Sequence, residues 1–236
     1  MPRPAVTRAE WLSARMELLE KEKALTRARD DLAAARRALP RVAVSADCSF
    51  TGPDGPESLS DLFGPHSQLV VYHFMYGPDL TAGCVNCSFW MDSLDGTAPH
   101  LAARDVALVL VSAAPYPQLA AYRARMGWQL RWVSSAGSSF NRDMGVQFTA
   151  EEVASGTATY NYRASGFPST EAPGLSVFQK DPDGTIHHTY SAFGRGLDGL
   201  NAAYQMLDLV PKGRDEAALP YPMAWVRRHD AYDAPA

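Results

Sequence analysis

Cysteine is scarce in this chain, with three residues among 236. Two of them, Cys84 and Cys87, form one C-x-x-C motif, and the sequence has neither a second C-x-x-C nor an H-x₃₋₅-H pattern. A disulfide scaffold needs more cysteines, and a structural zinc site normally needs a second ligand pair. The scarcity therefore argues against both and leaves one close pair of thiols to explain.

An excess of charge of one sign and long apolar runs are also missing. The formal net charge is only −4, so the large positive field that nucleic acid requires is absent and we expect no nucleic-acid partner. No stretch approaches the roughly 18 apolar residues of a membrane span, and the N-terminus lacks the apolar segment of a secretory signal. We therefore expect no membrane partner and a cytoplasmic location, where a close thiol pair is typically catalytic or metal-binding.

Length and composition predict one globular core with additions, because 46% of the residues are hydrophobic and 20% are charged. We divide the chain into an N-terminal helical arm (7–39), a core domain (40–210) and a C-terminal tail that packs on the core (211–236). Within the core domain, the Gly-, Ser- and Thr-rich segment 149–172 shows no clear period and is interpreted as an insertion.

The arm is predicted as one long helix that begins at a capping box of Thr7 and Glu10 and ends before Pro40. A seam of large apolar residues recurs every seven positions: Trp11, Leu18, Leu25, Leu32 and Leu39. A second row follows three positions later and consists of Ala14, Lys21, Ala28 and Ala35. Together the two rows form a narrow seam that needs a partner, although Lys21 interrupts the second row. Two interpretations stay open: a homodimer formed through the arm, or a helix clamped along its own domain.

The core is predicted to be α/β. Strands are expected at 42–50, 68–76 and 105–112, a short strand at 131–135, a hairpin around the turn 181–184, and helices at 59–63, up to 94, at 117–126 and at 197–209. Strands that alternate with helices of this length require crossover connections, so at least part of the sheet should be parallel.

The two cysteines lie where a Gly- and Pro-containing loop becomes a helix. The N–H groups and dipole of a helix N-terminus favour an anion, so Cys84 should have a lowered pKa and act as the attacking thiolate. Cys87 lies one turn further on, where it can attack a mixed disulfide on Cys84 and release the reduced substrate. The motif therefore indicates a thiol-disulfide oxidoreductase, for which no cofactor is expected.

Other interpretations of the cysteines stay open. They could be two buried thiols, or they could bind a soft metal such as Cu(I) with His73 as a third ligand, in a module that is not an enzyme. Cys48 stands alone and is interpreted as a small buried apolar residue. His187 and His188 are neighbours on one strand, so their side chains point to opposite faces and cannot form one site.

Several segments resemble the peroxiredoxin-type branch of the thioredoxin-like fold. These are "DGPESLSDLF", "LVVYHFMYGPDLTAGCVNC" and "VALVLVSAAP". The resemblance implies a mixed sheet flanked by helices. "APGLSVF" is similar to the cis-proline segment of that fold, which would give Pro173 a cis peptide bond and a place in the substrate groove.

Nearly the whole chain resembles the bacterial thioredoxin-like family known as domain-of-unknown-function family 899, whose members are labelled predicted dithiol-disulfide oxidoreductases. The segments that carry this resemblance include "EWLSARMELLEKEKALTRARDDLAAARRALP", "MGWQLRWVSS", "HTYSAFGRGLDGL" and "PMAWVRRHDAYD". It implies a protein or small-molecule thiol or disulfide as substrate and an electron donor that the sequence does not identify.

The segment around Cys84 also differs from the corresponding motif of peroxiredoxins. Peroxiredoxins carry P-x-x-x-T-x-x-C, whereas Pro78, Thr81 and Cys84 are one residue closer together, which keeps a thiol peroxidase as an alternative. A peroxidatic cysteine also needs a nearby arginine, for which the candidates are Arg123, Arg125 and Arg131. Three more residues complete the predicted site. Thr81 or Tyr76 would hydrogen-bond the thiolate, and Trp90 would border the substrate groove.

Overall fold

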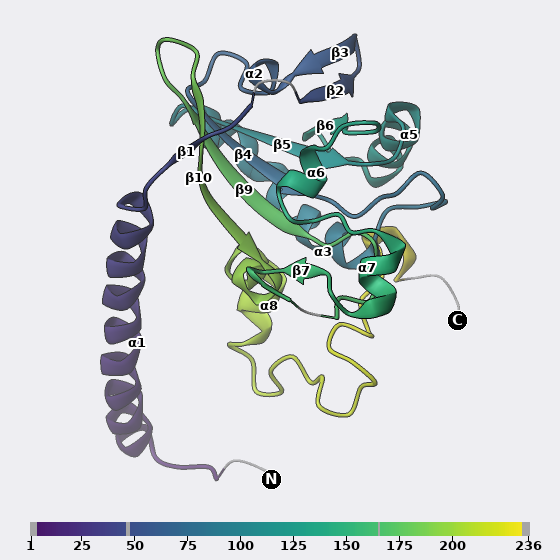
Figure 1. Cartoon of the computed structure of the whole chain (residues 1–236). Helices are drawn as coiled ribbons and strands as arrows, with labels where there is room; N and C mark the ends of the chain where they lie inside the picture. Colours follow the sequence, from purple (N-terminus) through teal and green to yellow (C-terminus); the bar gives the residue numbers. More distant parts are fainter. Residues whose placement is uncertain (1–3, 46–47, 165, 233–236) are drawn as a thin grey trace. The chain divides into compact units, whose positions relative to one another are not determined.

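The computed structural model describes residues 4–45, 48–164 and 166–232 (Figure 1). The chain forms two compact units, residues 1–40 and residues 41–236. Residues 46–47 of the predicted strand 42–50, residue 165 of the predicted insertion and the last four residues of the predicted tail lie outside the described residues. No helix among the described residues is both long and apolar enough to cross a membrane.

The first unit consists mainly of helix α1 (Arg8–Arg37). The predicted capping box is confirmed: Glu10 N donates to Thr7 Oγ1 at 3.3 Å, and Thr7 N donates to Glu10 Oε2 at 2.8 Å. None of the residues of α1 is buried, and the seam leucines are about half exposed, as Leu18 (50%) and Leu25 (54%) illustrate.

We propose that this seam joins two copies of the chain in a homodimer. Leu25→Glu is then expected to turn the dimer into a monomer, because the new carboxylate would be desolvated in the interface. Light scattering over a range of concentrations measures the change. Met16→Glu is the matched control, since Met16 lies on the opposite side of the helix and its replacement should leave the dimer intact. A wild-type protein that is monomeric at every concentration would reject the interface.

The second unit is built on a mixed sheet with the order β1-β10-β9-β4-β5-β6-β2-β3. Its strands are β1 (Val42–Ala43), β2 (Ser49–Gly52), β3 (Gly55–Ser58), β4 (Gln68–His73), β5 (Val106–Ser112), β6 (Arg131–Ser134), β9 (Gly174–Lys180) and β10 (Ile186–Phe193). A separate hairpin pairs β7 (Thr159–Tyr160) with β8 (Arg163–Ala164). The predicted strand 42–50 is wrong as one element, because β1 pairs with β10 while β2 pairs with β3 and β6.

Helices connect and cover these strands. They are α2 (Leu59–Leu62), α3 (Val85–Leu94), α4 (Ala98–Ala102), α5 (Tyr116–Met126), α6 (Phe140–Asp143), α7 (Ala150–Ser155) and α8 (Ala202–Leu207), with 3₁₀ turns η1 (Asp95–Thr97), η2 (Gly194–Leu200) and η3 (His229–Ala231). The segment 149–172 contains α7 and the β7–β8 hairpin, and α7 begins at a capping box of Thr149 and Glu152.

The strand directions define the fold. Strands β4, β5 and β6 are parallel, β9 is antiparallel to β4, and β10 is antiparallel to β9. Figure 1 shows β9 and β10 as one long hairpin beside β4. A parallel pair joined through a helix, followed by an antiparallel hairpin and a closing helix, is the thioredoxin-like arrangement, so the predicted α/β mixed sheet with helices is confirmed.

The sheet separates two hydrophobic clusters, because side chains alternate between its faces. On β4, Tyr72 belongs to the cluster formed with α3, α5 and α8, whereas Val71 belongs to the cluster formed with α2 and α6. Cys87 lies in the first cluster. The face that carries α3 therefore also carries the C-x-x-C motif.

The predicted closing helix 197–209 is wrong as a continuous helix, because it is divided into η2 and α8. Asn201 separates the two: its side chain accepts from Tyr204 N at 2.9 Å and caps α8, and its Nδ2 donates to Phe89 O at 3.2 Å. Asparagine favours such a cap over a helix interior. The break also fixes η2 against α3.

Candidate redox site

Cys84 lies at the junction between a loop and helix α3, as the spacing predicts. It is the N-cap of α3, its N–H donates to Met75 O at 3.1 Å, and its carbonyl accepts from Ser88 N at 3.0 Å. Gly83 is required just before it, since a Cβ there would lie 2.7 Å from the Phe74 ring and 2.8 Å from the Tyr122 ring. The backbone thus passes directly over an aromatic cluster and presents the cysteine at the helix terminus.

Cys84 is half-buried, and the pKa of its thiol is lowered. The Cys87 thiol, as a hydrogen-bond donor to the Cys84 sulfur, contributes most to lowering the pKa of Cys84 to about 6. Burial opposes this change, while the backbone N–H groups of Cys87 and Asn86 and the positive charge of Arg228 add to it. Cys84 is therefore largely a thiolate at neutral pH.

The pKa of Cys87 is shifted in the opposite direction to that of Cys84. It is 1% exposed, and burial raises its pKa well above the usual value, an effect that the neighbouring Cys84 reinforces. Cys87 therefore stays a protonated thiol until Cys84 has lost its negative charge. The two cysteines are not disulfide-bonded here, so the structure represents the dithiol form.

The positive charge near Cys84 comes from the C-terminal tail. Arg228 Nη2 donates to Gly83 O at 2.7 Å, and Nε donates to Tyr122 Oη at 2.7 Å. Tyr122 Oη lies 2.9 Å from Ser88 Oγ, which in turn donates to Cys84 O at 2.8 Å. The guanidinium is thus fixed through hydrogen bonds to the loop and to the first turn of α3.

The residues after Arg228 hold the tail in place. His229 Nδ1 lies 2.7 Å from Asp92 Oδ1 on α3, and Asp230 accepts from Arg125 Nε on α5 at 2.8 Å. Asp92 also accepts from Trp128 Nε1 at 2.9 Å. Consecutive tail residues are therefore bound to the two helices that flank the site.

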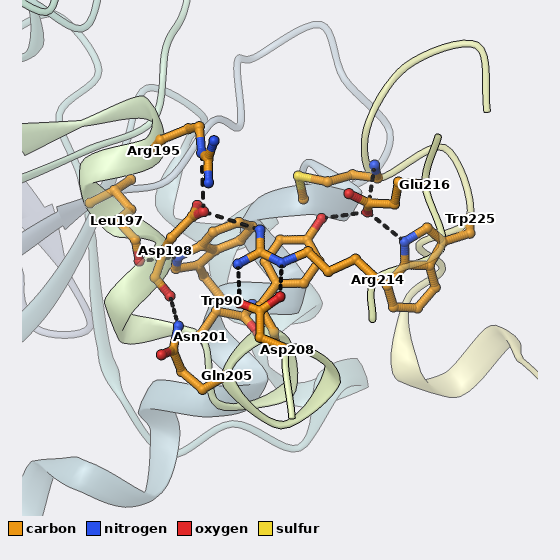
Figure 2. A network of polar contacts seen from close by, with 12 residues as sticks. Trp90, Arg195, Leu197, Asp198, Asn201, Gln205, Asp208, Arg214, Glu216 and Trp225 are labelled. Atoms are coloured by element: carbon orange, nitrogen blue, oxygen red, sulfur yellow. Dashed lines mark hydrogen bonds and ion pairs between the residues drawn. The ribbon is translucent and has the colours of Figure 1, made fainter. Parts of the chain in front are cut away.

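A second contact network holds the earlier part of the tail, as Figure 2 shows. Glu216 Oε1 accepts from Tyr204 Oη at 2.8 Å, from Trp225 Nε1 at 2.7 Å and from Met223 N at 3.0 Å. Met223 has a positive φ of 71°, a strained conformation for a residue other than glycine. The Glu216 hydrogen bond compensates for that strain and places Met223 beside the cysteines.

A pocket of about 350 Å³ opens next to the two cysteines. It is lined by Tyr72, Met75, Cys84, Asn86, Cys87, Trp90, Phe167, Pro168, Ser169, Pro173, Gly194, Arg195, Leu197, Asp198 and Met223. The structure thus brings the predicted residues Pro173 and Trp90 to the cysteine pair. The tail, η2 and the segment 149–172 complete the walls.

The cis peptide bond predicted before Pro173 is wrong, because no described peptide bond is cis. The chain enters β9 in extended form: Ala172 N donates to Val146 O at 2.9 Å and Phe148 N donates to Thr170 O at 2.8 Å. Pro173 borders the pocket with a trans bond.

Thr81 and Tyr76 do not take the predicted role. Thr81 is exposed in the loop, and Tyr76 is buried with its ring centroid 5.6 Å from that of Tyr122. Among the described residues, the groups that lower the pKa of Cys84 are Cys87, Asn86 and Arg228 instead.

Two of the three arginine candidates pair with other residues. Arg131 forms an ion pair with Glu57, and Arg125 forms one with Asp230. Arg228 is the arginine that acts on Cys84.

His73 cannot join the cysteines as a metal ligand. It follows Tyr72 on β4 and so points to the opposite face, where its Nε2 lies 2.9 Å from Ser176 Oγ and its ring packs 5.6 Å from Phe140. Burial lowers the pKa of His73 to about 3. Within the described residues, no three His, Cys, Asp or Glu side chains gather as a metal site. Cys48, partly buried, packs against the cluster on that same opposite face.

Glu171 is a titratable group that the sequence interpretation did not single out. Burial, and then the negative charge of Cys84, raise the pKa of Glu171 to about 7. A Cβ at Gly77 would lie 3.5 Å from its carboxylate, so Glu171 lies under the loop that leads to the cysteines. A carboxyl group that exchanges its proton near neutral pH can take up or release protons as the dithiol is oxidised.

Comparisons with known proteins give a set of similar solved structures and the family. Solved structures with a similar fold include peroxiredoxin Q from Xanthomonas campestris (TM-score 0.45, 15% identity, 70% of this chain and 92% of the other). Peroxidoxin BcpB from Mycobacterium tuberculosis (0.44, 16%, 71% and 97%) and a candidate thiol:disulfide interchange protein DsbE from Chlorobium tepidum (0.37, 16%, 72% and 96%) are also similar. Because these TM-scores are low, the fold assignment rests on the strand order of the sheet and not on these similarities.

Among curated proteins, none matches the sequence. The family described as "Bacterial protein of unknown function (DUF899)" matches residues 1–232, which is nearly the whole length. The chain therefore belongs to this DUF899 family.

Proposed function

We propose that the chain is a dithiol-disulfide oxidoreductase that works in the cytoplasm. The Cys84 thiolate attacks one sulfur of a substrate disulfide, which forms a mixed disulfide and releases one substrate thiolate. Cys87 then loses its proton and attacks Cys84 Sγ, which releases the second substrate thiolate and leaves a Cys84–Cys87 disulfide. Two electrons pass to the substrate, and an external dithiol returns them to the protein.

The observation that carries this proposal is the contrast between the two cysteines. The pKa of Cys84 is lowered to about 6 at the helix terminus, while burial raises that of Cys87. This contrast supports one nucleophile and one resolving thiol, because a resolving thiol should become reactive only after the first has formed a bond. Glu171 supports the second step as a nearby proton acceptor.

Equilibration against graded mixtures of a reduced and an oxidised dithiol tests the proposal. Rapid alkylation followed by intact-mass measurement counts the reactive thiols. We expect a single reversible step in which two thiols disappear together, and we expect Cys84→Ser and Cys87→Ser each to abolish it.

Cys48→Ser is the matched control, because Cys48 packs on the opposite face of the sheet and its loss should leave the two-thiol step in place. If Cys84 and Cys87 both stay reduced across the whole range of mixtures, the chain is not a dithiol oxidoreductase.

Thiol peroxidase activity is the second candidate, favoured by Arg228. Its guanidinium lies beside the Cys84 loop and lowers the pKa of Cys84, as a peroxidatic cysteine requires. The exposed position of Thr81 weighs against this candidate. Oxidation of Cys84 by hydrogen peroxide no faster than that of a simple thiol, compared at equal thiolate concentration, would reject it.

A further inference from the structure

The pocket beside the cysteines identifies the substrate class, an inference that rests on the proposed function. Its volume of about 350 Å³ is at the low end for small-molecule sites. Two methionines, Met75 and Met223, lie on its walls together with the ring of Trp90. Thioether side chains adapt to different shapes and pack well against sulfur and aromatic groups. The walls thus suit a compact, apolar molecule.

Two polar groups of the wall, on Trp90 and Tyr72, are already used within the protein. Trp90 Nε1, the single donor of that ring, donates to Leu197 O at 2.9 Å (Figure 2). The buried Tyr72 hydroxyl acts as a hydrogen-bond partner of Cys87. These residues therefore turn carbon surface toward the pocket.

The two charged residues that line the pocket, Arg195 and Asp198, pair with each other, and Asp198 also pairs with Arg214, which lies outside the lining. Asp198 accepts from Arg195 Nε at 3.3 Å and from Arg214 Nη1 at 3.1 Å, and Arg214 is also paired with Asp208 at 2.8 Å (Figure 2). The positive charges of the two arginines are thus balanced by the negative charges of the two aspartates. A strongly charged substrate would lose hydration on entering the pocket without gaining a dedicated partner.

We propose that the pocket binds a small, uncharged, largely apolar organic disulfide, with one arm in the pocket and its sulfur at Cys84. The Cys84 thiolate breaks the S–S bond of the substrate and forms the mixed disulfide, and the thiolate of the outer arm leaves. Cys87 then displaces the thiolate of the inner arm, as in the reaction above. The substrate is the two-electron oxidant, and an external dithiol restores the protein.

Three disulfides of matched shape test the proposal with the whole reduced protein. Dipropyl disulfide, bis(2-hydroxyethyl) disulfide and cystamine differ only in a terminal methyl, hydroxyl or ammonium group. Stopped-flow measurement gives the rate constant for the attack by Cys84, and each value is divided by that of a simple thiolate to remove intrinsic reactivity. We expect the normalised rate constant of dipropyl disulfide to be the highest of the three by about tenfold or more, because a buried hydroxyl without a hydrogen-bond partner is costly.

Met223→Lys places a charge in the pocket wall and is expected to reduce the advantage of dipropyl disulfide to less than about threefold. Met206→Lys is the matched control, since Met206 is 67% exposed on α8 and does not line the pocket. The Cys84 alkylation rate of each variant shows whether the site is still folded. In Met206→Lys, the order of the three disulfides should be that of the wild type.

The outcomes separate the substrate class from the function. Normalised rates that are equal for the three disulfides, or highest for cystamine, overturn the apolar substrate class. This outcome leaves the proposed oxidoreductase function unaffected. Failure of all three disulfides and of the graded dithiol mixtures to oxidise the Cys84–Cys87 pair overturns the proposed function, and the substrate class with it.

Discussion

At pH 7, iodoacetamide is expected to alkylate Cys84 at least about a hundredfold faster than Cys87. A thiol with a pKa of about 6 is roughly 90% thiolate at this pH. The pKa of Cys87 is raised well above the usual value by burial, so this thiol stays protonated at pH 7, and its side chain is 1% exposed. Peptide mapping after timed alkylation measures both rates.

The pH dependence of this reaction has a definite direction. Since only the thiolate reacts, the Cys84 rate should rise with pH, reach half its maximum near pH 6 and then level off. Equal rates for the two cysteines at pH 7, or a Cys84 rate that still rises above pH 8, would contradict the proposed role of Cys84 as the nucleophile.

Arg228 provides a separate test of how the tail acts on the thiolate. Arg228→Met should move the midpoint of the pH profile to higher pH and lower the alkylation rate at pH 6 by less than about threefold, because a nearby positive charge favours the thiolate but Arg228 contributes least among the groups that lower the pKa of Cys84. Arg227→Met removes the same charge from the neighbouring position, where the side chain donates to Ala224 O and Val226 O. It should leave the midpoint unchanged.

Features with local signals were predicted from the sequence. The capping box at Thr7 and Glu10 and the placement of Cys84 at a helix N-terminus each depend on residues within one or two turns of one another. The strand alternation of His73 is also a local signal, since neighbours on a strand point to opposite faces, and in the structure Tyr72 shares the face of Cys87 while His73 does not. The rule that separated His187 from His188 would have removed His73 from the candidate metal site.

Features that depend on distant parts of the chain were not predicted. Arg228 reaches Gly83 across 145 positions, and the segment "WVRRHD" contains two adjacent arginines that the sequence does not distinguish. The pKa of Glu171 depends on burial under a loop that is far away in the sequence. In both cases tertiary packing decides which charge lies at the site.

Glu216→Ala is expected to release the C-terminal tail and cost about 2 to 4 kcal/mol of stability. The carboxylate accepts from Tyr204, Trp225 and Met223, and hydrogen bonds to a charged group are worth about 1.5 to 3 kcal/mol each, with incomplete additivity. Met223 would also lose the contact that compensates for its positive φ. Denaturant unfolding measures the loss, and limited proteolysis detects the released tail.

Glu216→Gln removes the charge of the side chain but keeps its shape. Because the amide oxygen can still accept hydrogen bonds, Glu216→Gln should lower the free energy of unfolding by less than Glu216→Ala. Burial alone would raise the pKa of Glu216, but hydrogen bonds from Trp225 and Tyr204 outweigh it and the pKa is lowered. A carboxyl group with a lowered pKa in the folded state stabilises the protein above its unfolded pKa, and this stability is lost as pH falls through the folded value. The difference between wild type and Glu216→Gln should thus be largest at neutral pH and vanish in acid.

The same variant connects the tail to the chemistry. Met223 borders the pocket and Arg228 follows five positions later, so detachment of the tail in Glu216→Ala should open one wall and remove the positive charge from Cys84. The alkylation rate of Cys84 at pH 6 should then fall as it does in Arg228→Met. If Glu216→Ala lowers stability but leaves the alkylation midpoint near pH 6, Arg228 is held by His229 and Asp230 alone, and the Glu216 network serves the pocket wall rather than the thiolate.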